Sequence, residues 1–144
     1  DQNGNHVIQK CIEKVPGPLI EFIVSAFHHQ VFSLSSHPYG CRVIQRLLEH
    51  CSEAQRVGEG YCLLLLLFYS CTELCQNQYG NYVVQHVLVH GTAWHRGAII
   101  TALRGKVCTL SRHKFASNVV EKCFAHAGKP ERAELIHEVL GSKD

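Results

Sequence analysis

The stretch QYGNYVVQHVL, residues 78–88, decides how this chain folds. Its apolar residues come in adjacent pairs, and polar residues separate the pairs. Three other segments align with it without gaps: NGNHVIQKCI (3–12), PYGCRVIQRLL (38–48) and KFASNVVEKCF (114–124). One pattern that recurs along a chain of 144 residues predicts an array of similar units stacked on one another.

The recurrence has a regular period. We number the positions of each motif from the residue that follows the small Gly or Ala, and we call these positions slots. Slot one holds Asn5, Cys41, Asn81 and Ser117, so the intervals are 36, 40 and 36 residues. The longer interval places an insertion within residues 56–70, where consecutive leucines replace the expected amphipathic helix. We interpret this segment as a distorted or buried helix, and a splicing or gene-model irregularity is the alternative.

Apolar residues upstream of the motifs repeat in the same register. They are Val31, Cys71 and Val107; Leu34, Leu74 and Leu110; and the three sets Ile23, Val24, Phe27, then Ile99, Ile100, Leu103, then Leu135, Ile136, Val139. Each unit is therefore expected to be a helix, a short turn and a second helix that carries the motif. These motif helices are expected near residues 4–14, 40–51, 80–90 and 116–127 of the single domain 1–144, with incomplete units at both ends.

Each motif helix has two chemically different faces. A helix advances about 100° per residue, so slots three, four, seven and eight share one face, which we expect to be buried. All sixteen residues there are apolar: Val7, Ile8, Cys11, Ile12; Val43, Ile44, Leu47, Leu48; Val83, Val84, Val87, Leu88; Val119, Val120, Cys123, Phe124. Slots one, two and five form a narrow stripe on the other side: Asn5, His6, Gln9; Cys41, Arg42, Gln45; Asn81, Tyr82, Gln85; Ser117, Asn118, Glu121.

The chemistry of this stripe suits unstacked nucleic-acid bases. Short donors and acceptors at slots one and five can contact a base edge, because residues four apart lie on one helix face. Planar groups at slot two can stack on bases, which contributes about 1–3 kcal/mol per base. Slot six supplies a basic flank for phosphates: Lys10, Arg46, His86 and Lys122. Duplex DNA hides its base faces, so single-stranded RNA is the expected partner, and DNA is not.

Composition excludes several other classes of protein. The net charge is only +2, so RNA binding must depend on local geometry rather than on bulk charge. The longest apolar run, residues 61–71, is shorter than the roughly 20 residues that span a bilayer, so no membrane is expected as a partner. Cysteines in apolar helical slots act as small hydrophobic residues, which favours a reducing compartment and a cytoplasmic location.

Metal and catalytic sites were weighed and set aside. His86 and His90 are four residues apart, as are Cys71 and Cys75, but the chain has no C-x-x-C pair, so no metal or other cofactor is expected. His37 and His113 share one repeat position before the motif, which indicates structural contacts at the start of each motif helix. Cys41 lies in slot one with no base tied to it, so no enzymatic activity is expected.

The motifs HPYGCRVIQ, QYGNYVVQ and HKFASNVVE resemble the Pumilio (PUF) family of RNA-binding repeats. The similarity covers essentially the whole chain apart from residues 56–70. It implies an all-α fold, a right-handed and curved α-solenoid of repeats of 36 residues, with RNA antiparallel to the protein on the concave face. The chain is then a partial array from the C-terminal portion of such a domain, with four motif helices.

The resemblance also implies a base for each helix. In the family's code Asn with Gln reads uracil, Cys with Gln reads adenine, and Ser with Glu reads guanine. Carried over to this chain, the pairs in slots one and five are Ser117 and Glu121 for G, Asn81 and Gln85 for U, Cys41 and Gln45 for A, and Asn5 and Gln9 for U. Slot two, with His6, Arg42, Tyr82 and Asn118, is expected to stack on the bases.

The expected element is 5′-GUAU-3′, within UGUA-type sites in the 3′ untranslated regions of messenger RNAs. The family further implies repression of translation and message stability, with translational co-repressors and a deadenylase complex as possible partners. Two alternatives remain at this point. One is a helical-repeat scaffold that binds only proteins, and the other is a nucleolar PUF-like protein that binds RNA with low specificity.

Overall fold

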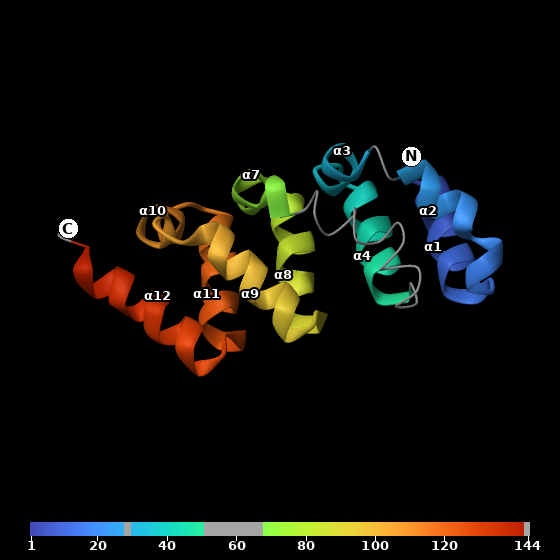
Figure 1. Ribbon diagram of the computed structural model, residues 1–144. Coiled ribbons are helices and arrows are strands. Elements are labelled where there is room, and N and C mark those ends of the chain that lie inside the picture. Colours follow the sequence, from blue (N-terminus) through green and yellow to red (C-terminus); the bar gives the residue numbers. More distant parts are fainter. Residues whose placement is uncertain (28–29, 51–67, 143–144) are drawn as a thin grey trace.

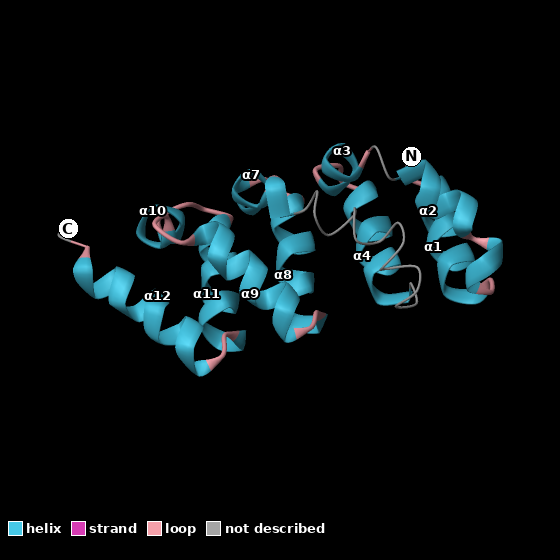
Figure 2. Cartoon of the chain, viewed as in Figure 1, coloured by secondary structure: helices cyan, strands magenta, loops and turns pink. Residues whose placement is uncertain are grey.

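The computed structural model describes residues 1–27, 30–50 and 68–142, and every regular element in these ranges is a helix (Figure 2). The helices form a curved row, with the two termini at opposite ends (Figure 1). This arrangement is the expected all-α solenoid. The insertion expected within residues 56–70 lies outside the described residues, except for its last three positions.

The four motif helices make up the inner row of the solenoid. They are α1 (Gly4–Lys14), α4 (Gly40–His50), α8 (Gly80–His90) and α11 (Ala116–His126), and each differs from its expected range by at most one residue. Each packs against the next, α1 on α4, α4 on α8 and α8 on α11 (Figure 1). Equivalent slots on successive helices therefore lie side by side.

Each full unit contains three helices, which corrects the expected pair. The outer helices are α2 (Glu21–Phe27), preceded by the short 3₁₀ helix η1 (Gly17–Leu19), then α9 (Ala93–Leu103) and α12 (Lys129–Gly141). The short helices α3 (Val31–Ser35), α7 (Cys71–Gln76) and α10 (Val107–Ser111) follow one edge of the row. Gly105 separates α9 from α10 because its φ of 75° lies in the left-handed region, which ends the outer helix and turns the chain.

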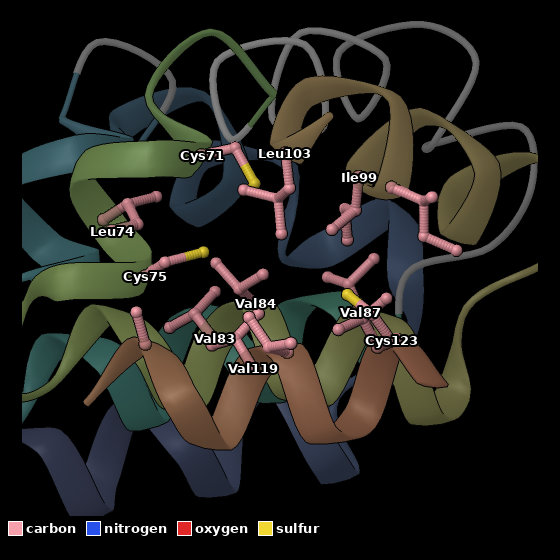
Figure 3. Close-up of a cluster of buried hydrophobic side chains, with 14 of the residues drawn as sticks. Cys71, Leu74, Cys75, Val83, Val84, Val87, Ile99, Leu103, Val119 and Cys123 are labelled. Carbon is pink, nitrogen blue, oxygen red and sulfur yellow. The ribbon is translucent and has the colours of Figure 1, made fainter. Parts of the chain in front are cut away.

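The core between α7, α8, α9 and α11 is formed by side chains from a short helix, an outer helix and two motif helices. Figure 3 shows Leu74 and Cys75 above Val83 and Val84, with Ile99 and Leu103 closing the space from α9. Cys71, Cys75 and Cys123 are all at most 2% exposed, so they act as small core residues. Burial and the nearby Cys71 raise the pKa of the Cys123 thiol to about 12. A hydrogen bond with Cys71, together with burial, raises the pKa of Cys75.

Eleven residues of the expected apolar face of the motif helices are buried and four are half-buried. Of its sixteen residues Val7 alone is exposed, at 62%, because no described helix packs on the outer side of α1. The other end of the row behaves in the same way. Ile136 and Val139 of α12 are 44% and 42% exposed, whereas the equivalent Ile100 and Leu103 of α9 are buried. The terminal units of the described array therefore present apolar surface.

The start of each motif helix is fixed by two local constraints. A Cβ on Gly80 would lie 2.8 Å from Leu74 Cδ2, so a small residue is needed where the short helix crosses the motif helix. A side-chain acceptor also closes the preceding turn by accepting from the backbone N–H groups two and three residues later. These acceptors are Asp1, His37, Asn77 and His113. The structural role expected for His37 and His113 is thereby confirmed.

Asn77→Ala is expected to lower the free energy of unfolding by about 1 kcal/mol, because the N–H groups of Tyr79 and Gly80 lose their acceptor. Urea unfolding followed by far-UV circular dichroism measures the change. Asn77→His is the matched control, because His37 and His113 perform the same contact through Nδ1. Equal destabilisation by both variants would contradict the role given to the acceptor.

Candidate nucleic-acid interface

The candidate interface is the reader stripe, which we define as slots one, two and five of the four motif helices. Exposure varies regularly across it: slot two is exposed on all four helices, and slot five is half-buried on three. Slot one is buried at Asn5, Cys41 and Asn81, where at most 5% is exposed. The helical wheel set slot one opposite the buried face, so the burial of these three residues did not follow from it. Side chains in the first turn lean back toward the helix N-terminus, and this directs slot one under the preceding turn.

Asn81 and Gln85 form a hydrogen-bonded pair in α8. Asn81 Nδ2 donates to the carbonyl oxygen of Asn77 at 2.8 Å, and Gln85 Nε2 donates to Asn81 Oδ1 at 2.9 Å. Asn81 is therefore anchored to its turn, and Gln85 is anchored to Asn81. Among the described residues, the Gln85 carbonyl oxygen and its second N–H have no partner, so both remain for a ligand.

The same arrangement occurs in α1. Asn5 Nδ2 donates to the carbonyl oxygen of Gln2 at 2.6 Å, and Gln9 Nε2 donates to Asn5 Oδ1 at 2.8 Å. Two helices with the same residues in slots one and five thus hold the glutamine amide in the same orientation. A carbonyl acceptor beside an N–H donor in one plane can form two hydrogen bonds to a base edge.

In α4 the slot-one residue is Cys41, and its hydrogen bonding differs from that of Asn5 and Asn81. Its thiol makes a weak contact, 3.5 Å long, with the carbonyl oxygen of Pro38. Burial raises the pKa of this thiol, and the charge of Arg42 offsets only part of that rise. A thiol is a poor acceptor for an amide, so Gln45 is not tied to slot one as Gln85 is. The Gln45 amide can therefore turn over and present donor and acceptor in either order.

Ser117 and Glu121 make α11 the acidic reader. Ser117 Oγ donates to the carbonyl oxygen of Lys114 at 3.5 Å, a long contact that leaves the hydroxyl available as an acceptor. Glu121 is exposed and has no ion pair among the described residues. Its carboxylate can accept two N–H groups from one ligand edge.

The slot-two side chains lie at the surface of the stripe. Tyr82 is 58% exposed, and His6, Arg42 and Asn118 are exposed as well. Since the motif helices pack side by side, one such group recurs on each helix along the stripe. Tyr82, His6 and Arg42 have the flat faces that stack on bases, whereas Asn118 offers the smallest surface.

The basic flank expected at slot six is largely occupied by ion pairs. Lys10 Nζ lies 2.9 Å from Glu13 Oε2, Arg46 bonds to Glu49, and His86 Nε2 lies 2.7 Å from Glu49 Oε1. Lys122 is the one member of this flank without an ion pair among the described residues. The structure therefore places three of the four flank residues against carboxylates, and a free role in binding phosphate is left to Lys122.

Glu13 and Glu49 were not among the site residues predicted from the sequence. Both occupy slot nine, one turn beyond the slot-five glutamines, and their spacing of 36 residues was a readable signal. Burial acts to raise the pKa of Glu49, but the hydrogen bonds and charges of His86 and Arg46 hold it below its usual value. The hydrogen bond from Lys10 likewise lowers the pKa of Glu13, with the charge of Arg46 adding to the effect.

Two further properties concern the described ranges 1–27, 30–50 and 68–142. They contain no group of three or more His, Cys, Asp or Glu side chains that could hold a metal ion. No helix in these ranges combines the length and the apolar character needed to cross a membrane.

The sequence matches a family model described as the Pumilio-family RNA binding repeat at residues 1–28, 30–57, 70–104 and 106–140. It is 39% identical to a Pumilio domain-containing protein of Schizosaccharomyces pombe over 143 residues, which cover 99% of this chain and 20% of that protein. It is 37% identical to Fem-3 mRNA-binding factor 2 of Caenorhabditis elegans over 156 residues, covering 97% of this chain and 25% of that protein.

Two solved structures have the same fold over almost all of the chain. PUF-8 in complex with PBE-RNA superposes with a TM-score of 0.89 at 38% identity, covering 100% of this chain and 41% of that one. The Puf3 RNA binding domain bound to the Cox17 RNA 3′ UTR recognition sequence superposes with a TM-score of 0.85 at 42% identity, covering 95% and 39%. The chain thus spans a quarter or less of the two curated relatives and about two fifths of these structures.

Glu49→Gln is expected to lower the free energy of unfolding at neutral pH by at most about 1 kcal/mol, because water still screens a partly exposed pair. A carboxyl whose pKa is lowered by folding stabilises the protein above its unfolded pKa and loses that effect as it is protonated. The difference between the two proteins should therefore close as the pH falls below 4.5, the ordinary value for Glu. Urea unfolding at a series of pH values measures it. A difference that stays constant down to pH 3 would contradict the pairing.

Proposed function

The chain belongs to the Pumilio family of RNA-binding repeat proteins, and we propose that it binds single-stranded RNA of the sequence 5′-GUAU-3′. The observation that carries this proposal is the repeated reader stripe, in which a short slot-one residue, an exposed slot two and a slot-five group recur on four helices packed side by side. Each motif helix offers one base edge contact and one stacking surface, so four helices suit four successive bases.

Uracil suits the readers on α1 and α8. Its edge places an N3–H donor beside carbonyl acceptors, and Gln85 offers a carbonyl oxygen beside an N–H donor. Because Gln85 Nε2 already donates to Asn81 Oδ1, its amide is oriented before RNA arrives. Gln9 is oriented in the same way by Asn5. Orientation in advance lowers the entropic cost of binding and favours uracil at both positions.

Adenine suits the reader on α4. Its edge pairs an amino donor with a ring-nitrogen acceptor, and a glutamine amide forms two hydrogen bonds with such an edge. Gln45 can meet it because Cys41 does not hold the amide in the orientation that Asn81 imposes on Gln85. The small thiol also leaves room for the base to approach the helix.

Guanine suits the reader on α11. The guanine edge carries N1–H and an amino group, two adjacent donors that an acceptor-only carboxylate satisfies together. Glu121 provides that carboxylate, and Ser117 beside it provides a small hydroxyl. Since Asn118 stacks less well than Tyr82, the guanine contact depends more on hydrogen bonds than the uracil contact does. Lys122, one turn beyond Asn118, is the cation left for a nearby phosphate.

We further propose that the target lies in 3′ untranslated regions of messenger RNAs, within UGUA-type elements, and that binding represses translation and shortens message lifetime. Fem-3 mRNA-binding factor 2 is by its name an mRNA-binding protein, and the Puf3 domain has been solved on a 3′ UTR recognition sequence. Translational co-repressors and a deadenylase complex are the protein partners that such a role requires, and the cytoplasm is where it would operate.

The test is equilibrium binding of the chain to short RNAs that contain 5′-GUAU-3′ and to the single-base variants of that element, at low salt. Each change is expected to weaken binding, because each mismatch costs one reader its hydrogen bonds. The double variant Ser117→Asn, Glu121→Gln gives α11 the slot-one and slot-five residues of α8. It should shift the preference at the first base from G to U by roughly tenfold.

Glu73→Gln is the matched control, since it removes one carboxylate from α7, outside the reader stripe. It is expected to leave the base preference unchanged. Continued preference for G in the double variant would show that the assigned readers are wrong. Absence of RNA binding at low salt, with a folded protein, would favour a protein-binding scaffold instead.

A further inference from the structure

A line of alternating acidic and basic side chains crosses three motif helices beside the reader stripe. We call it the charge ladder, and its members are Glu13 of α1, Arg46 and Glu49 of α4, and His86 of α8. Arg46 Nε lies 3.4 Å from Glu13 Oε1, and His86 Nε2 lies 2.7 Å from Glu49 Oε1. Arg46 also bonds to Glu49 within α4. Each carboxylate therefore joins its own helix to the next helix of the row.

The ladder lies next to the readers on the same helices. Glu13 follows Gln9 by four residues and Glu49 follows Gln45 by four, so each carboxylate sits one turn beyond a slot-five glutamine on the same side of its helix. His86 follows Tyr82 by the same interval. Any sliding or rotation of a helix that breaks the ladder also displaces the reader one turn away.

The two cross-helix pairs differ in exposure: the side chains of Arg46 and Glu13 are 38% and 23% exposed, and the pair of His86 with Glu49 is the more sheltered one. The side chain of His86 is 10% exposed and that of Glu49 is 29% exposed. Screening by solvent and salt is weaker for such groups, so their attraction is larger than that of a fully solvated pair. Lys10 and Arg46 also offset the charges of two carboxylates that would otherwise repel RNA phosphates beside the stripe.

The ladder ends between α8 and α11. Slot nine holds Val89 in α8 and Ala125 in α11, and no ion pair joins these two helices among the described residues. Apolar contacts between buried side chains such as Val83, Val84 and Val119 hold that junction (Figure 3). Among the described residues, the α1–α4 and α4–α8 junctions therefore each contain a carboxylate that pairs with the neighbouring helix, and the α8–α11 junction does not. The α8–α11 junction serves as an internal control.

We propose that Glu13 and Glu49 are positioning residues that fix the spacing between consecutive readers, and that Glu49 in particular holds the readers on α4 and α8 one base apart. The proposal depends on the proposed RNA-binding function, because it concerns how that function keeps its register. Glu49 acts through the helices it joins and contacts no base. Its loss is expected to loosen the step between U and A while the step between G and U is preserved.

The experiment measures the affinity of the full chain for three RNAs: 5′-GUAU-3′, 5′-GUCAU-3′ with a base inserted at the α8–α4 step, and 5′-GCUAU-3′ with a base inserted at the α11–α8 step. The unsubstituted chain should discriminate against both insertions. Glu49→Gln keeps the shape of the side chain and removes its charge. It should reduce discrimination against 5′-GUCAU-3′ by about three- to tenfold and leave discrimination against 5′-GCUAU-3′ unchanged.

Two companion variants separate positioning from general stability. His86→Gln removes the cross-helix contact of Glu49 and leaves its bond to Arg46 within α4, so it should reproduce the loss of discrimination caused by Glu49→Gln, and the double variant should add little to that loss. His86→Lys places a cation opposite Glu49 and should retain the discrimination. Circular dichroism confirms that each variant is folded, and Glu73→Gln on α7 again serves as the control for loss of a carboxylate.

The outcomes are distinct. If Glu49→Gln weakens binding to all three RNAs equally, or changes none of them, the positioning role is overturned while RNA binding stands. If the unsubstituted chain binds none of the three RNAs, the proposed function fails and the positioning role fails with it. If His86→Lys behaves as His86→Gln does, the ion pair is not what sets the spacing, and the proposal is overturned.

Discussion

The apolar contact between neighbouring motif helices is the constraint on which the rest of the structure depends. In the α8–α11 pair Val83, Val84 and Val119 are almost completely buried, and Figure 3 shows them facing one another beneath α9. Close-packed side chains of this kind limit two helices to a narrow range of distances and rotations. That rotation turns slots one, two and five of both helices toward the same side. The reader stripe, which extends over four helices, is thus a consequence of core packing.

Slot one connects this core to the function. Asn81 is 1% exposed, so its polar atoms must be bonded inside the protein, and they are, to the turn at Asn77 and to Gln85. A buried residue therefore orients an accessible one. Where slot one is Cys41, the same position supplies no acceptor and the neighbouring glutamine is left free to turn over. Specificity along the stripe would then arise as much from the interior as from the surface.

Much of this could be predicted from sequence, because a gap-free repeat reports both period and face. The ranges of the motif helices, and the inward orientation of nearly all of their sixteen apolar residues, could be derived from the spacing of residues such as Val83, Val84 and Val87. The third helix of each unit was not predicted from the sequence. Gly105 turns the chain between α9 and α10, and the apolar pattern of a two-helix unit does not predict a turn at that point. The burial of Asn5 and Asn81 also escaped, because a helical wheel ignores the turn that covers the first residues of a helix. The partners of Glu13 and Glu49 lie on neighbouring helices, and a wheel of one helix cannot show them.

The most direct test of the account is a crystal structure of this chain bound to 5′-GUAU-3′ RNA. The account predicts one base at each motif helix, with G at Ser117 and Glu121 of α11, then U at α8, A at α4 and U at α1. The RNA would run antiparallel to the chain, and the Gln85 amide would keep its hydrogen bond to Asn81 while it contacts the uracil edge. RNA bound on the outer helices α9 and α12, or in the opposite direction along the motif helices, would contradict it.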